Sequence, residues 1–190
     1  MTTNTVACYN TLIRPAARWM EVPILLAFNL LLVASAYLSI HLPFSPVPVT
    51  GQTLGVLLVA MALGRTRGVG VVLAYLAEGA AGLPVFAGGT GSLVVLFGPT
   101  GGYLLGFVAA AYVVGSCSDR GWHTSYIKSM IAMIAGTAVI FAAGLSWLAF
   151  FVPAASLLNL GFWPFLPGAA LKLAVASAAL PTISKFVHRG

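Results

Sequence analysis

The sequence predicts an all-α integral membrane protein with six transmembrane helices, both termini in the cytoplasm, and structured outer loops that cap a pocket. Three observations support this fold class. Hydrophobic residues make up 60% of the 190 residues and charged residues only 6%, whereas about 25% of a soluble domain is charged. The apolar residues form runs long enough to span a membrane. The basic residues lie almost entirely in alternate connections between these runs.

The membrane domain is expected at residues 22–187, after a cytoplasmic N-terminal segment of residues 1–21. Its first helix is expected at about residues 22–40, because a span needs about 20 apolar residues. A signal peptide is the alternative, since Arg14 and Arg18 could form its basic region and Ala34-Ser35-Ala36 resembles a cleavage site. We favour a retained helix, because the apolar run continues to position 40.

Proline and glycine separate the five later helices. The Pro-rich segment 41–49 follows the first helix, and the sequence Gly-Arg-Thr-Arg-Gly at 64–68 closes the second with a turn. The second and third helices are short for complete spans. A polar turn precedes the fifth helix, and a Pro- and aromatic-rich turn precedes the sixth. The five helices are expected at about residues 50–64, 69–82, 100–116, 127–151 and 165–186.

The segment of residues 82–107 contains no charge and is broken by glycine and proline. It is too irregular for one helix, while Val85, Phe86 and Phe97 are too apolar for a surface loop. Irregular backbone at membrane depth occurs only where it is buried in protein or lines a cavity. We therefore expect residues 82 to about 99 to form an outer loop that caps a pocket. A ligand site should be sought there first.

The positions of the basic residues predict the orientation. The connections after the first, third and fifth helices contain no Lys or Arg. Because cytoplasmic connections are enriched in these residues, the opposite face is cytoplasmic, and the protein is a multi-pass protein of the cell membrane. Eight of the nine basic residues lie on that face: Arg14, Arg18, Arg65, Arg67, Arg120, Lys128, Lys185 and Arg189. Trp19 and Trp122 are expected at its membrane boundary, and Trp147 and Trp163 at the outer one.

Several function classes are disfavoured. The net charge of +6 does not indicate nucleic-acid binding, because no basic stripe or binding motif is present. Cys8 and Cys117 have no paired spacing, so neither a disulfide framework nor a metal site is indicated. An enzyme is disfavoured because His41, His123 and His188 fall in connections or the tail, and no paired carboxylates share a helix.

Two charged residues inside predicted helices require partners. Lys172 lies about 8 to 12 Å from the outer end of the sixth helix, and Glu78 at a similar depth in the third. Burying a lysine there costs on the order of 2.5 to 3.5 kcal/mol unless it faces a partner or a wet cavity. One interpretation is a Glu78–Lys172 ion pair that only joins the two helices. We favour the interpretation that Lys172 binds an anionic group of a ligand entering from outside.

The outer ends of the helices offer further binding groups. Helices two, four and six begin at the outer face, so their unpaired N–H groups point to the same side. Thr50, Gln52 and Thr53 lie at one such start, and Gly101 and Tyr103 at another. The glycines of GPTGG are no phosphate loop, because no Lys-Ser or Lys-Thr follows. They can also serve only as a tight turn and as small residues for helix packing.

Four motifs closely resemble the BioY family, the biotin-capturing S components of energy-coupling-factor (ECF) transporters. They are PVPVTGQTLGVLL at 46–58, AYLAEGAAGLPVFAGG at 74–89, LFGPTGGYLLGF at 96–107 and PGAALKLA at 167–174. The resemblance covers about residues 22–187 and implies an outward-facing biotin pocket. It also implies a transmembrane coupling subunit and two cytoplasmic ATPase subunits as partners, with no cofactor in this chain. By its match to the last motif, Lys172 would bind the biotin carboxylate.

The remaining parts of biotin suit other residues near the outer face. The ureido group suits amide and hydroxyl partners such as Gln52, Thr53 or Tyr75. The apolar rings and chain suit Phe86 and Tyr103, although these aromatic residues can equally be packing residues. The candidate ligand-binding residues are Lys172, Glu78, Tyr75, Gln52, Thr53, Phe86, Gly88, Gly101 and Tyr103.

The sequence also departs from the family pattern. The last motif of the family usually has an aspartate three residues before the lysine, where this chain has Ala169. The outer loop can carry a basic residue that also serves the carboxylate, whereas residues 88–97 have none. The Ala-x-x-x-Ala pattern that packs on the coupling subunit is absent from residues 22–40. A solitary biotin facilitator and an S component for another small anionic vitamin therefore stay as alternatives.

Overall fold

The structure is a computed structural model that describes residues 20–187, most of which are helical. Several residues used above lie outside the described part: Cys8, Arg14, Arg18, Trp19, His188 and Arg189. The helices are α1 (Glu21–Tyr37), α2 (Gln52–Ala80), α3 (Leu93–Phe97), α4 (Gly101–Asp119), α5 (Tyr126–Leu148), α6 (Leu157–Gly161) and α7 (Leu166–Val187). Two short strands, β1 (Ser39–Ile40) and β2 (Val49–Thr50), and the single-turn helices Ala87–Gly89, Trp122–Thr124, Ala154–Ser156 and Trp163–Phe165 complete the list.

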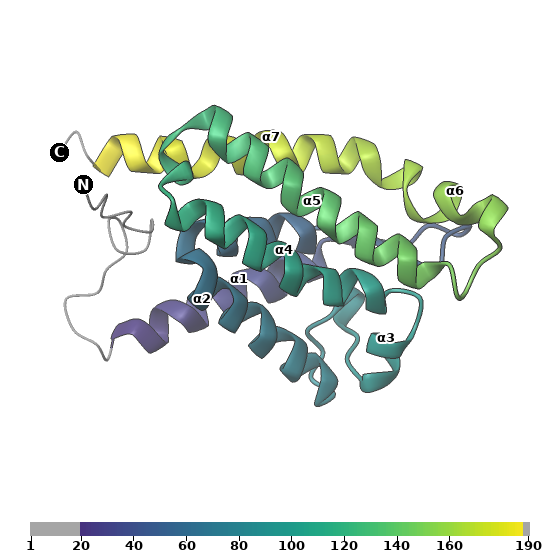
Figure 1. Cartoon of the computed structure of the whole chain (residues 1–190). Coiled ribbons are helices and arrows are strands. Elements are labelled where there is room, and N and C mark those ends of the chain that lie inside the picture. Colours follow the sequence, from purple (N-terminus) through teal and green to yellow (C-terminus); the bar gives the residue numbers. More distant parts are fainter. Residues whose placement is uncertain (1–19, 188–190) are drawn as a thin grey trace.

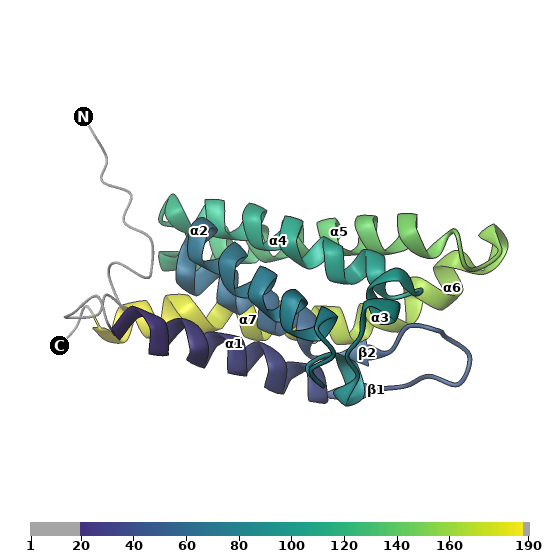
Figure 2. The same cartoon turned by 90° about the horizontal axis from the view of Figure 1, so that it is seen from below.

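The five long helices α1, α2, α4, α5 and α7 form an elongated bundle (Figures 1 and 2). The short helices α3 and α6 lie at one end of it with β1 and β2, and we call this the loop end. The two strands pair antiparallel, with Ser39 opposite Thr50 and Ile40 opposite Val49. This pairing ends α1 earlier than the expected position 40 and holds the connection 41–48 at the loop end (Figure 2). α1 begins and α7 ends at the opposite end of the bundle (Figures 1 and 2).

The helices have the length and composition of membrane spans. Within residues 20–187, four stretches are long and apolar enough to cross a membrane: Gln52–Ala80, Gly101–Asp119, Tyr126–Leu148 and Ala154–Ala178. α1 is also apolar but has only 17 residues. Large hydrophobic side chains such as Leu30, Ile127 and Leu171 are exposed on the outer faces of the bundle. An apolar outer surface of this kind is typical of a protein in contact with lipid.

α2 is one helical stretch of 29 residues where the sequence predicts two helices and a five-residue turn. Its only non-helical residue is Gly64, with φ of 77°, a conformation that glycine adopts readily. The two halves fold back on each other there, as the hydrogen bond from the Gln52 amide to the Tyr75 hydroxyl shows. In an unbroken helix these residues would lie roughly 35 Å apart. Residues 65–68, expected in the turn, are helical instead.

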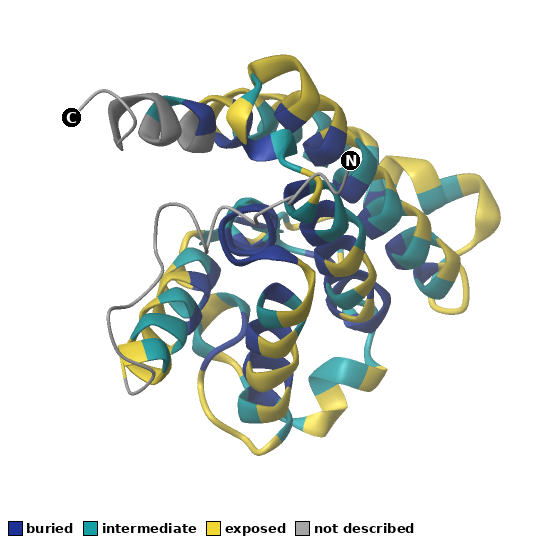
Figure 3. Cartoon of the chain, turned by 60° about the vertical axis from the view of Figure 1, so that its left-hand side comes forward, coloured by how far each residue is buried: buried dark blue, intermediate teal, exposed yellow. Residues whose placement is uncertain are grey.

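The half of α2 before Gly64 is the centre of the bundle. Its residues 55–63 are nearly all buried, and Val56 and Met61 are fully so. Figure 3 shows the buried residues toward the middle of the molecule and the exposed residues on its outer faces. Glycine allows close approach around this centre: a methyl group on Gly106 of α4 would lie 3.2 Å from the Cα atom of Ile140 in α5. Small residues at helix contacts are typical of membrane bundles.

Candidate ligand-binding pocket

A cavity of about 220 Å³ lies at the loop end of the bundle. The connection 41–48, the beginning of α2, the segment 86–95, α4, α5 and α7 all contribute to its lining. A concave, mostly apolar cavity with a few polar groups is the usual form of a small-molecule site. Its polar lining residues are His41, Thr50, Gln52, Thr53, Thr90, Thr100, Tyr103, Thr137 and Lys172.

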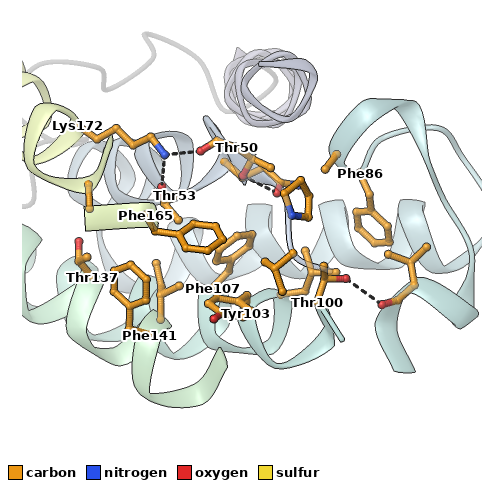
Figure 4. Close-up of a pocket in the computed structure, with 18 of the residues that line it drawn as sticks. Thr50, Thr53, Phe86, Thr100, Tyr103, Phe107, Thr137, Phe141, Phe165 and Lys172 are labelled. Carbon is orange, nitrogen blue, oxygen red and sulfur yellow. Dashed lines mark hydrogen bonds between the residues drawn. The ribbon is translucent and has the colours of Figure 1, made fainter. Parts of the chain in front are cut away.

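Lys172 lies in the second turn of α7 and brings the single charged side chain among the residues that line the pocket. Its Nζ atom donates to the main-chain oxygen of Thr50 and to Oγ1 of Thr53, the latter at 3.2 Å (Figure 4). Both acceptors are uncharged, so the positive charge stays available to an anion in the cavity. An ammonium group has three donors, and these contacts use two of them.

The alternative Glu78–Lys172 ion pair is wrong. The carboxylate of Glu78 instead accepts a hydrogen bond of 3.1 Å from the side-chain amide of Asn29 in α1. This contact joins α1 to the second half of α2. Glu78 is not among the residues that line the pocket.

A short polar chain fixes the side chain of Gln52 at the pocket wall. Its Oε1 atom accepts a hydrogen bond of 3.0 Å from the Thr50 hydroxyl, and its Nε2 atom donates to the Tyr75 hydroxyl. Tyr75 is fully buried behind the pocket, and its ring packs edge-on against Phe86 with 5.4 Å between centroids. Buried polar groups that bond one another in this way hold a single orientation.

Aromatic rings from three elements form the apolar wall (Figure 4). Tyr103 of α4 stacks on Phe165, with 6.3 Å between ring centroids and an interplanar angle of 23°. Phe141 of α5 meets Phe165 edge-on at 6.3 Å. The Tyr103 hydroxyl donates to the main-chain oxygen of Gly161 at 2.8 Å, which ties α4 to α6. Offset and edge-on pairs of this kind are the favourable geometries for aromatic side chains.

The structure brings five of the nine candidate residues to the pocket: Gln52, Thr53, Phe86, Tyr103 and Lys172. Tyr75 lies behind Gln52, and Glu78 is paired with Asn29. Gly88 and Gly101 do not line the cavity either. Gly101 begins α4 where a methyl group would collide with the main chain of Leu96, so this glycine allows α3 and α4 to pack closely.

Sequence reasoning missed the contribution of α5 and of His41. Three residues of α5 line the pocket: Thr137, Ile140 and Phe141. The sequence does not distinguish them, because α5 is apolar on all faces and no pattern marks the face that meets the cavity. His41 could have been found, because it begins the Pro-rich segment that leads directly into Thr50.

Comparison with known proteins gives relatives over most of the chain. The sequence profile of the BioY family matches residues 10–189. The chain is 40% identical to a biotin transporter BioY of Thermotoga maritima over 151 residues, which are 79% of this chain and 87% of that protein. It is 37% identical to a biotin transporter BioY of Rhizobium etli over 73% of this chain and 78% of that protein.

A solved structure shares the fold. The crystal structure of the S-component for biotin from an ECF-type ABC transporter superposes with a TM-score of 0.78 and 24% sequence identity. The match covers 93% of this chain and 96% of that one.

Fold and cavity together define a helical protein of membrane type with a mostly apolar pocket at one end of its bundle. The relatives are named as transporters, which confirms the prediction of a transporter rather than an enzyme. The chain belongs to the BioY family, as its four motifs predict.

Proposed function

We propose that this protein captures biotin from the outer face of the cell membrane as the substrate-binding subunit of an ECF-type importer. The observation that carries the proposal is Lys172, a cation held by two uncharged oxygens in the wall of a mostly apolar cavity. Biotin offers one carboxylate for this cation and an apolar body for the aromatic wall. The BioY relatives of similar length support the choice of biotin.

The proposed membrane arrangement has six crossings. α1, the two halves of α2, α4, α5 and α7 supply them, and both termini lie in the cytoplasm. The loop end then faces outward, since Arg65 and Arg67 in α2, together with Arg120 and Lys128, belong to the opposite end. The connection 41–48 and the segment 81–99 cap the pocket in this arrangement. Biotin thus enters from the outside between the two segments.

The proposed ligand contacts follow the pocket lining. Lys172 binds the carboxylate, with Thr53 beside it. Tyr103 of the aromatic wall and Phe86 on the far side of the cavity pack against the apolar rings and chain. Gln52, whose amide is fixed by its partners, faces a polar group of the ligand.

The transport step is proposed to need partners. A transmembrane coupling subunit and two cytoplasmic ATPase subunits would return the loaded subunit to the inside, because no nucleotide motif is present in this chain. A solitary facilitator is the alternative. Uptake that stops when cellular ATP is depleted supports the coupled importer, and uptake that persists favours the facilitator.

Equilibrium binding of labelled biotin to detergent-purified protein tests the proposal. Lys172→Ala removes a charge-assisted hydrogen bond of about 1.5 to 3 kcal/mol and should weaken binding roughly 10- to 150-fold. Lys172→Arg keeps the charge and should bind with intermediate affinity. Lys128→Ala, an exposed basic residue at the far end of the bundle, is the matched control and should bind like the wild type.

The outcomes separate the parts of the proposal. Wild-type binding that is unchanged in Lys172→Ala means that the carboxylate is held elsewhere. If folded wild-type protein binds no biotin, the substrate is wrong, and other small anionic vitamins should be tested in the same assay.

A further inference from the structure

One polar side chain of the pocket has no hydrogen-bond partner in the part of the chain that the structure describes. His41 lines the cavity from the connection between β1 and β2. The other polar lining residues all bond to protein atoms: Thr50, Gln52, Thr53, Tyr103 and Lys172 as given above, and Thr90, Thr100 and Thr137 to the main-chain oxygens of Ala87, Val95 and Met133. His41, which is an exposed residue, is therefore the hydrogen-bonding group of the lining that a ligand can engage without breaking a bond to protein.

The imidazole ring of His41 packs against Gly88. A methyl group on Gly88 would lie 3.1 Å from Cε1 of His41 and 3.9 Å from its Nε2. Gly88 has a φ of 66°, which favours glycine, so both the conformation and the missing side chain leave room for the ring. Gly88 thus contributes to the pocket indirectly, by supporting His41.

His41 belongs to the side of the pocket away from Lys172. Gly88 follows Phe86 by two residues, and Figure 4 shows Phe86 and Lys172 at opposite sides of the cavity, with the aromatic wall between them. A ligand whose anionic end is at Lys172 and whose apolar part lies on this wall brings its other polar end toward the segment that supports His41.

We propose that His41 is a ligand-binding residue that hydrogen-bonds a neutral amide- or urea-type group at the end of the ligand opposite the carboxylate. A neutral imidazole has one N–H donor and one nitrogen acceptor. A urea has N–H donors and a carbonyl acceptor, so either ring nitrogen finds a complementary partner. The inference rests on the proposed function, in which this group is the ureido ring of biotin.

The test is equilibrium binding to His41→Leu, which keeps a side chain of similar size but removes the donor and the acceptor, and to His41→Gln, which keeps both. His41→Leu should weaken biotin binding about two- to tenfold, since a neutral hydrogen bond contributes about 0.5 to 1.5 kcal/mol. His41→Gln should recover most of this loss. Phe44→Ala, an exposed residue of the same connection outside the pocket lining, is the control and should bind normally.

A second ligand identifies the group that His41 contacts. Biotin amide lacks the carboxylate and keeps the urea. The wild type should prefer biotin to its amide, Lys172→Ala should lose this preference, and His41→Leu should bind both more weakly with the preference intact. Unchanged affinity in His41→Leu overturns the contact, and loss of the carboxylate preference in His41→Leu overturns the urea assignment. Both outcomes require a wild type that binds biotin, so they differ from failure of the proposed function.

Discussion

Tyr75 shows how a buried residue can act on the pocket without lining it. Its hydroxyl is the partner that fixes the Gln52 amide. Tyr75→Phe keeps the ring contact with Phe86 but removes this partner, so the Gln52 side chain loses its fixed orientation. We expect biotin affinity to fall about fivefold, which corresponds to a net hydrogen bond of about 1 kcal/mol.

A double-mutant cycle distinguishes positioning from general damage. If Tyr75 acts through Gln52, then Tyr75→Phe should have almost no further effect on affinity in a Gln52→Ala protein. Fully additive losses in the double variant would show that Tyr75 acts by another route. Thermal unfolding of each variant checks that the fold is retained.

At the residue scale, the environment that a side chain requires is easier to predict from the sequence than the partner with which it forms a hydrogen bond. A lysine in an apolar helix requires a polar environment, and the structure places Lys172 in one. Its partners could not be predicted, because main-chain oxygens such as that of Thr50 leave no trace in a residue pattern. The alternative of a Glu78–Lys172 pair rested on opposite charge and similar depth, whereas the neutral side chain of Asn29 in α1 binds Glu78.

Helix α2 depends on glycine at the crossing of its two halves. A methyl group on Gly68 would lie 2.9 Å from the Cα atom of Ala60, whereas one on Gly70 would meet no atom within 4 Å. Gly68→Ala should therefore lower the free energy of unfolding by about 1 to 3 kcal/mol through overpacking. Gly70→Ala should leave stability unchanged or raise it by up to about 1 kcal/mol, since alanine favours helix.

Thermal unfolding of the two single variants in the same detergent measures this difference. Because both positions lie in one helix, their comparison removes effects of composition and of detergent. Equal melting temperatures for Gly68→Ala and Gly70→Ala would contradict the close crossing of the two halves.

At the element scale, the sequence predicts which segments are helical but not how the chain turns between them. Two Arg residues between glycines resemble an ordinary loop. In the structure of α2 only Gly64 has non-helical backbone angles, and Arg65 and Arg67 are part of the helix. Glu21 of α1 binds Arg67 there at 2.7 Å, a tertiary contact that a local pattern does not contain.

The orientation of the whole molecule can be tested with single cysteines. In a protein with Cys8 and Cys117 replaced by alanine, Ala154→Cys at the loop end should react with a membrane-impermeant maleimide in intact cells. Arg120→Cys, exposed at the other end of the bundle, should react only after permeabilisation. The reverse pattern would show that the loop end faces the cytoplasm.

For the whole molecule, composition and motif order predict the membrane class and the BioY family. The family profile and relatives confirm the family, and four helical stretches within residues 20–187 have the length and composition that the membrane class requires. The pocket was harder to predict, because it is assembled from segments as distant as His41, Ile140 and Lys172. Only their arrangement in space shows which side of an apolar helix such as α5 meets the cavity.

The segments at the loop end are joined largely through main-chain acceptors. Side chains of Tyr37, Ser45 and Trp147 donate to the main-chain oxygens of Pro84, Leu160 and Gly98, at 2.6, 2.7 and 3.0 Å. Every residue type carries such an oxygen, so substitution at the accepting positions does not remove the acceptor. The contacts between the loops therefore depend on the path of the main chain at Pro84, Leu160 and Gly98 and not on the side chains at these positions.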